Sequence, residues 1–244
     1  MPSRTPLHRY DHRALLVALV LVVIWGGNVT LQKYLFGLIS PGGFLWARYL
    51  IMPVCALFLM RWRFGRCLPP LPRKDWMHMA WLGFIGHSLH VGLVTYGIHW
   101  STAFSSSVIL ACGPIFTLLI LRVQGLERLS LPQMAGVTLA FGGVLVFLSD
   151  KLLGGHWRAG GGDLVLLIAA GLFSYYTVAV KPVMQRHGPV LTMGYATLLG
   201  GLPVMLLSVP AGLEANWSSL DFWAWVGLLW SVMVSAFIGW LAWG

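Results

Sequence analysis

Two histidines in an apolar stretch carry the most versatile chemistry of this sequence. His87 and His90 lie near the middle of segment 76–98 and, at three residues apart, share one face of a helix. Because imidazole titrates near neutrality, the pair suits proton coupling as well as interhelical hydrogen bonding or cavity lining. A metal site would need more ligands, and His78 and His99 lie toward opposite ends of the segment. We therefore expect neither a metal ion nor a cofactor.

A single charged residue lies well inside the long apolar segments, and this residue is Arg48. A charge in the hydrocarbon region is costly, so it faces a cavity, pairs with a partner, or extends toward the membrane surface. The apolar segments contain no acid that could pair with it. A substrate carboxylate and backbone carbonyl groups are the two remaining kinds of partner.

A third polar group follows helical spacing inside the first apolar run. Trp25, Asn28 and Gln32 recur at i, i+3 and i+7 within WGGNVTLQK, so they share one helix face. An amide that faced lipid would lose its hydrogen bonds, so this face should contact other helices or a polar cavity. Tyr175 and Tyr176 lie in a later run, where a phenol can line an apolar pocket or simply pack. The candidates for substrate binding are Trp25, Asn28, Arg48, His87, His90, Tyr175 and Tyr176.

Composition identifies the kind of protein that holds these side chains. Of the 244 residues, 58% are hydrophobic and 9% are charged, whereas soluble domains have about 25% charged residues. The chain is therefore expected to be an all-α, polytopic membrane protein. Cys55, Cys67 and Cys112 fit neither a metal spacing nor a disulfide framework. The first apolar run is too long for the core of a signal peptide, so we interpret it as a retained span.

Eight apolar segments are long enough to cross a bilayer, since about 20 helical residues span its hydrocarbon core. Pro41 and Pro189 precede or open two of them, which suits the first turn of a helix, and Pro114 should kink the fourth. Most tryptophans near the segment ends fit interfacial aromatic belts. The expected spans are 14–36, 42–60, 76–98, 103–121, 131–149, 164–181, 190–210 and 222–243.

The basic residues between these spans indicate the orientation of the chain. Twelve of the 16 lie on the side of the N-terminus, and three (Lys33, Lys151 and Arg158) lie on the other side. This bias places the N-terminus in the cytoplasm. The formal charge of +9 therefore reflects membrane topology, and we do not expect binding to nucleic acid.

An internal repeat relates the two parts of the chain. Lys33 matches Lys181 and Pro41 matches Pro189, both at an offset of 148 residues, and Trp25 falls on Phe173. The dipeptides at 75–76 and 221–222 are also similar. A repeat unit of five spans is odd in number, so the second copy should run inverted through the membrane, an arrangement that recurs in secondary transporters.

Several motifs, in this order and spacing, resemble the EamA-type transporters of the drug/metabolite transporter superfamily. They are WGGNVTLQK at 25–33, Pro41 with the later pair Arg48-Tyr49, SSSVILACGPIFTLLI at 105–120, Glu127 followed by LSLPQMAGVTLAFGGVLV at 129–146, GDLVLLIAAGLFSYYTV at 162–178, and SAFIGWLAW at 235–243. The resemblance implies a helical bundle of inverted five-span repeats. It also implies secondary transport of a small organic metabolite, such as an amino acid or a drug-like compound, by alternating access in the cell inner membrane.

The resemblance and the repeat together predict four parts of the chain. These are a cytoplasmic tail at 1–13, a first repeat at 14–149, an external loop at 150–163 and a second repeat at 164–244. The family usually has ten spans, so we expect two more spans beyond the eight, or a homodimer or partner chain that supplies them. The expected partners are a small-molecule substrate and the lipid bilayer.

Two alternatives to transport belong to other classes of function. One is a membrane-embedded metalloenzyme that uses the histidines of segment 76–98. The other is a remnant that does not transport and only packs with a partner chain. No nucleophile elbow or phosphate-binding glycine loop is present in the sequence, so an enzyme is not expected.

Overall fold

Helices form all the regular structure in the described residues, 12–65, 68–154 and 157–243, of this computed structural model. A backbone inside lipid must satisfy its own hydrogen bonds, which is why apolar runs of this length become helices. The first seven elements are α1 (His12–Leu35), α2 (Pro41–Phe64), α3 (Arg73–Gly83), η1 (Phe84–His90), α4 (Val91–Trp100), α5 (Ala103–Leu110) and α6 (Gly113–Val123). The others are α7 (Leu131–Leu153), α8 (Trp157–His187), α9 (Pro189–Glu214), η2 (Trp217–Ser219), α10 (Phe222–Leu229), η3 (Trp230–Ile238) and α11 (Gly239–Trp243).

Seven helices in the described part of the chain are long and apolar enough to cross a membrane. The polytopic helical bundle predicted from composition is thus confirmed, although the sequence predicted eight spans. The eighth, 76–98, is present as the helical series α3, η1 and α4, which runs without a break. The charged first turn and the four histidines of this series make it more polar than the other seven. The loop expected at 150–163 is largely helical, because α7 and α8 extend into it. The predicted tail, 1–13, lies almost wholly outside the described residues.

Local sequence signals set several helix ends. Ser40 caps α2, since its Oγ accepts a hydrogen bond from the Gly43 amide at 3.1 Å, and Pro41 occupies the first turn. Pro189 likewise occupies the first turn of α9. The fourth span is broken into α5 and α6 just before Pro114, as the missing amide hydrogen of proline predicts.

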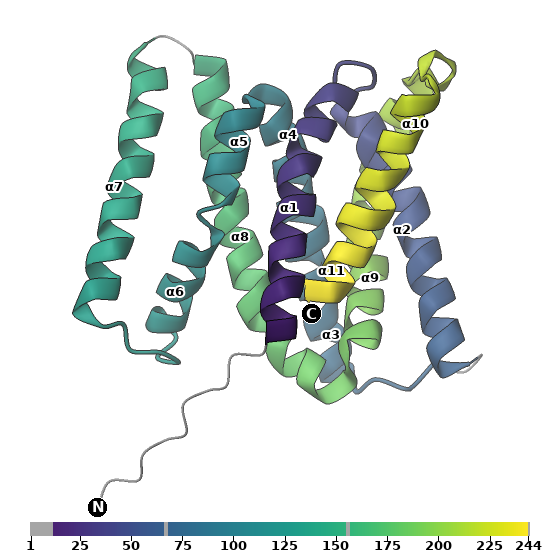
Figure 1. The fold of residues 1–244 in the computed structure, drawn as a ribbon. Helices are drawn as coiled ribbons and strands as arrows, with labels where there is room; N and C mark the ends of the chain where they lie inside the picture. Colours follow the sequence, from purple (N-terminus) through teal and green to yellow (C-terminus); the bar gives the residue numbers. More distant parts are fainter. Residues whose placement is uncertain (1–11, 66–67, 155–156, 244) are drawn as a thin grey trace, which may run out of the picture.

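The two parts of the chain run in opposite directions through the bundle (Figure 1). From its N-terminal end, α1 rises in this view, whereas its repeat equivalent α8 descends. The repeat also extends to an unusual element, because η1 and η3 are both π-helices. Each begins nine residues after the aspartate of its repeat, Asp75 or Asp221. This agreement in position supports the inverted repeat that the sequence predicted.

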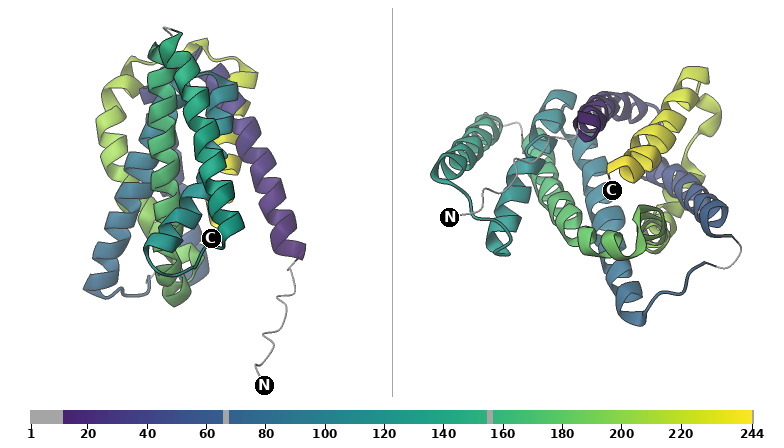
Figure 2. Two further views of the ribbon diagram at one scale, coloured as in Figure 1. Left: turned by 90° about the vertical axis from the view of Figure 1, so that its left-hand side faces the viewer. Right: turned by 60° about the horizontal axis from the view of Figure 1, so that its bottom comes forward.

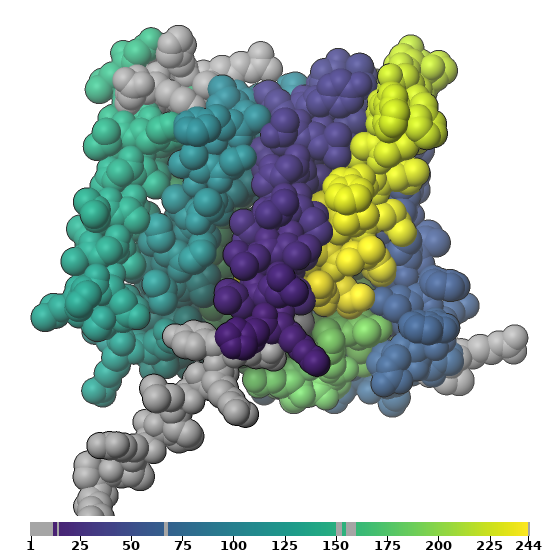
Figure 3. Space-filling view, viewed as in Figure 1, coloured from purple at the N-terminus to yellow at the C-terminus, as the bar shows by residue number. Residues whose placement is uncertain are grey.

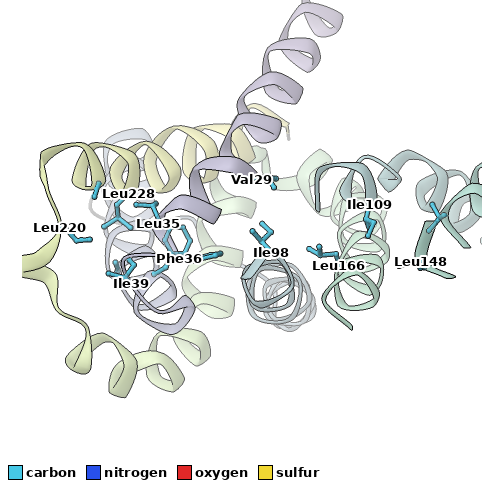
Figure 4. Close-up of a cluster of buried hydrophobic side chains, with 14 residues drawn as sticks. Val29, Leu35, Phe36, Ile39, Ile98, Ile109, Leu148, Leu166, Leu220 and Leu228 are labelled. Carbon is cyan, nitrogen blue, oxygen red and sulfur yellow. The ribbon is translucent and has the colours of Figure 1, made fainter. Parts of the chain in front are cut away.

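The central helices bury the largest apolar cluster between them. In Figure 4, Val29 and Leu35 of α1 and Phe36, which follows α1, lie in one cluster with Ile98 of α4 and Leu166 of α8. Figure 2 shows α7 at one edge of the bundle, where it packs on α8. On the face seen in Figure 3, α1 lies between the helices α5–α6 and the C-terminal helices α10–α11.

The close crossing of α3 and α9 depends on glycine. A methyl group added at Gly200 would overlap the backbone of Gly83, and one at Gly83 would overlap the backbone at Ala196. Small residues at such a crossing let two backbones approach within contact distance. This contact joins a helix of the first repeat to a helix of the second.

An ionic cluster joins the two repeats at the end of the bundle where α8 terminates. The Asp75 carboxylate accepts hydrogen bonds from Arg186 Nη2 and His187 Nε2, each at 2.7 Å. These bonds, first that of His187 and then that of Arg186, hold the pKa of Asp75 below its ordinary value. The charged form of Asp75 therefore stabilises the contact between α3 and α8.

Candidate functional site

A cavity of about 150 Å³ lies between helices of the first and the second predicted repeat. A volume of this size holds a ligand about as large as a benzene ring. Residues of the first repeat on its wall are Trp25, Asn28, Val29, Gln32, Arg48, His90, Val91, Val94, Ile98, Leu110 and Gly113, and those of the second are Ala170, Phe173, Ser235, Ala236 and Trp240. Inverted-repeat transporters bind their solutes at this kind of interface.

Arg48 supplies a fixed positive charge to the cavity wall. Only 6% of the residue is exposed, and among the described residues it forms neither a hydrogen bond nor an ion pair. Its guanidinium carbon lies 5.9 Å from the centre of the Tyr49 ring, a cation–π contact that does not neutralise its charge. A buried guanidinium without a counter-ion is costly, so this position favours the binding of an anion.

Two amide oxygens on the same wall have no hydrogen-bond partner in the described part of the chain. They are Asn28 Oδ1 and Gln32 Oε1, and both residues are buried. An unsatisfied buried acceptor costs about 1–3 kcal/mol. A ligand that carries a donor, such as an ammonium group, would remove this cost.

His90 presents one ring nitrogen to a backbone carbonyl. Its Nδ1 lies 2.9 Å from Ala169 O, and because a carbonyl oxygen only accepts, Nδ1 carries the hydrogen. In the neutral form of the ring, Nε2 is then an acceptor. The ring stacks on Phe173 with 4.9 Å between the ring centres, which fixes its orientation at the cavity.

An aromatic group encloses the cavity on one side. The indole Nε1 of Trp25 donates to the Ser235 carbonyl at 2.9 Å, which fastens α1 to η3. Its ring meets Phe173, the residue that matches Trp25 in the repeat, edge to face at 6.0 Å. It also lies 5.4 Å from the Trp243 ring.

The structure brings four of the seven sequence candidates together, namely Trp25, Asn28, Arg48 and His90. His87 lies outside this wall, fully buried with its Nε2 3.4 Å from Thr197 Oγ1 and its ring 4.5 Å from Trp240.

The two tyrosine candidates also lie outside the wall. Tyr176 is buried behind it and donates to Met193 Sδ at 3.2 Å. Tyr175 lies near the surface of the bundle, where its hydroxyl is 3.5 Å from Trp81 Nε1. Both tyrosines therefore pack in the surrounding bundle, and neither lines the cavity.

Two aromatic residues of the wall are missing from the sequence candidates. Phe173 had a usable signal, because it is the repeat equivalent of Trp25. Trp240 had none, because it is one of 13 tryptophans, most of which suit an interfacial belt. In the described residues, no three His, Cys, Asp or Glu side chains gather where they could hold a metal ion.

A comparison with protein-family models matches residues 12–149 to the EamA-like transporter family. The chain belongs to the EamA-like transporter family. Together with the seven membrane-spanning helices, this membership makes the chain a multi-pass membrane protein of the drug/metabolite transporter type.

Curated relatives of this EamA-like chain are named as transporters. An uncharacterised transporter of Synechocystis is 24% identical over 88% of this chain and 68% of its own length. The probable amino-acid metabolite efflux pump of Escherichia coli is 23% identical over 93% of this chain and 76% of its own length. A probable terminal-alkyne amino-acid exporter of Streptantibioticus cattleyicolor is 27% identical over 70% of this chain and 56% of its own length. These names indicate transport rather than catalysis.

No solved structure shows significant similarity to the chain.

Proposed function

We propose that this EamA-like protein exports a small zwitterionic metabolite, of the amino-acid class, across the inner membrane by alternating access. The N-terminus lies in the cytoplasm, in keeping with the excess of basic residues on that side. The observation that carries the proposal is the unpaired Arg48 on a cavity between two inverted repeats. The names of the Escherichia coli and Streptantibioticus relatives support an amino-acid substrate and the outward direction.

The groups on the cavity wall match a zwitterion in number and kind. The Arg48 guanidinium would bind the carboxylate, for which its planar fork is suited. The oxygens of Asn28 and Gln32 and the Nε2 of His90 would accept from the ammonium group. Trp25, Phe173 and Trp240 would enclose an apolar side chain. Because the whole cavity holds a ligand of about the size of one benzene ring, that side chain must be smaller than a ring.

The decisive experiment measures uptake of radiolabelled amino acids into everted membrane vesicles, in which export appears as uptake. The natural protein should accumulate at least one neutral amino acid with an apolar side chain. Arg48→Gln should raise its KM by about 10- to 150-fold, because a hydrogen bond to a charged group contributes about 1.5–3 kcal/mol. The expected direction of movement also tests the assignment as an exporter.

Arg48→Lys is the matched control, because it keeps the charge but loses the planar pair of donors. It should retain part of the transport that Arg48→Gln loses. Equal transport by Arg48→Gln and the natural protein would refute the proposed role of the cavity. Each variant is compared at equal amounts of monodisperse protein, so that loss of folding is not read as loss of binding.

A further inference from the structure

Two main-chain groups reach the central cavity at the break between α5 and α6. The break lies beside α8 in Figure 1 and falls at Ala111 and Cys112, just before Pro114. Leu110, which ends α5, and Gly113, which begins α6, both line the cavity. The end of one helix and the start of another therefore meet at the cavity wall.

Each of these helix ends carries a group that is free to bind a ligand. In a continuous α-helix the Leu110 carbonyl would accept from the amide four residues on, but that residue is Pro114, which has no amide hydrogen. Within the described residues, no hydrogen bond reaches the Leu110 carbonyl and none is made by the Gly113 amide. The break thus offers the cavity an acceptor and a donor.

The break is small, and a contact with α8 fixes its position. Ala111 and Cys112 keep right-handed helical dihedral angles, with φ of −66° and −75°. Ser174 of α8 is buried, and its hydroxyl donates to the Gly113 carbonyl oxygen at 2.8 Å. The free groups are therefore held in place before any ligand binds.

The two free groups are also neighbours in space by chain geometry. In a helical turn, the carbonyl oxygen of one residue faces the amide of the residue three positions on, and Leu110 and Gly113 have this separation. A ligand that binds both groups needs a donor and an acceptor close together. An α-amino acid has this arrangement, because its ammonium and carboxylate groups are attached to one carbon atom.

Buried side chains on the same wall lack partners of the same two kinds. Arg48 is a donor that is 6% exposed and has no counter-ion in the described part of the chain. Asn28 is 8% exposed, and its Oδ1 is an acceptor without a partner there. A helix end alone could be satisfied by water, but unpaired buried side chains beside it favour a ligand that carries both charges.

We propose that the break between α5 and α6 is a main-chain subsite for the head group of an α-amino acid. The Leu110 carbonyl accepts from the ammonium group, and the Gly113 amide donates to the carboxylate, whose charge the N-terminus of α6 favours. A γ-amino acid carries the same charges farther apart and reaches only one of the two groups. The subsite rests on the proposed function and deepens it by naming the class of amino acid.

The first test measures the binding of three small ligands to the purified protein by isothermal titration calorimetry. L-2-aminobutyrate and 4-aminobutyrate are isomers that differ in the position of the ammonium group, and butyrate lacks this group. The natural protein should bind L-2-aminobutyrate about tenfold more tightly than either of the others, because each of them loses a hydrogen bond that involves a charged group. Equal affinity for the two isomers would overturn the proposal.

The second test closes the break with Pro114→Ala. The new amide can donate to the Leu110 carbonyl, which then no longer binds the ammonium group. The Kd of L-2-aminobutyrate should rise about tenfold or more, whereas that of butyrate should change by less than about twofold. Pro132→Ala, in the first turn of α7 where no amide hydrogen is needed, is the matched control and should leave both values unchanged.

Two results with Pro114→Ala would contradict the subsite. An unchanged Kd for L-2-aminobutyrate would show that the Leu110 carbonyl does not bind it. An equal rise for butyrate would show a general distortion of the cavity, because butyrate has no ammonium group to lose.

The third test follows the donor by hydrogen exchange, resolved residue by residue. The Gly113 amide should exchange rapidly in the free protein, and saturating L-2-aminobutyrate should slow it about tenfold or more. The Ile115 amide, which donates to the Cys112 carbonyl at 3.0 Å, is the internal reference and should exchange slowly in both states. A Gly113 rate that the ligand does not change would exclude this amide as the donor.

These outcomes separate the subsite from the proposed export. Binding that depends on Pro114 as stated, without uptake of L-2-aminobutyrate by everted vesicles, would retain the subsite and reject export. Uptake together with equal binding by the natural protein and Pro114→Ala would retain export and reject the subsite.

Discussion

At the scale of single residues, the site holds polar atoms that its own fold leaves unpaired. Asn28 Oδ1 is buried without a hydrogen-bond partner among the described residues. Asn28→Leu, of similar size, should therefore stabilise the folded protein by about 1 kcal/mol or more. The same change should weaken solute binding, because it removes an acceptor from the cavity wall.

The measurement for Asn28→Leu pairs a thermal unfolding curve with the KM for the transported amino acid. Higher thermal stability with a raised KM is the expected combination. A destabilised variant would show that the amide is satisfied by ordered water or lipid in the membrane. Asn28→Asp serves as a comparison, because its carboxylate would compete with the solute for Arg48.

Sequence reasoning predicted part of the site for identifiable reasons. Trp25 and Asn28 follow α-helical spacing in α1, so their shared face could be predicted correctly. His87 and His90 were expected to share a face, and within the π-helix η1 both rings do contact Trp240, but of the two only His90 lies on the cavity wall. Nothing in the local sequence announces a π-helix, because it arises from packing between helices.

At the scale of helices, the Gly83–Gly200 crossing sets how closely the two repeats pack. Gly200→Ala should destabilise the protein by about 1–3 kcal/mol, because the added methyl overlaps backbone that cannot move away. Gly143→Ala, on a part of α7 with open space around it, should be neutral or slightly stabilising. Thermal unfolding in detergent measures both, and equal stability of the two variants would contradict the close crossing.

Helix positions were largely predictable, whereas helix continuity was not. Apolar length predicted the helical segments, and Pro114 correctly predicted the break between α5 and α6. Yet Pro53, Pro182 and Pro203 lie inside uninterrupted helices. Whether a proline interrupts a membrane helix depends on which neighbours satisfy the freed carbonyl, and this information is tertiary.

At the scale of the whole molecule, the ionic cluster at Asp75 links stability to pH. His187 and Arg186 lower the pKa of Asp75 in the folded protein. A carboxyl with a lowered pKa stabilises the folded state above its ordinary pKa of 3.8, and this contribution is lost as the pH falls through the lower folded value. As the pH falls below 3.8, the stability of the natural protein should therefore decline toward that of Asp75→Asn.

The pH prediction is checked by thermal unfolding of both proteins from about pH 6 to about pH 3. The difference between them should stay constant in the upper part of the range and shrink at the acid end. A difference that does not change with pH would show that Asp75 contributes through packing alone. The sequence could not predict this cluster, since its members lie 111 and 112 residues apart.

The paired π-helices also carry information about ancestry. A π-helix contains more residues per turn than an α-helix, and single-turn examples arise most simply when one residue is added to a helix that already exists. η1 and η3 begin at matching places in the two repeats, nine residues after Asp75 and Asp221. One residue added in an ancestor of a single repeat, before its duplication and fusion, would account for both. The widened turns would then be older than the full-length transporter.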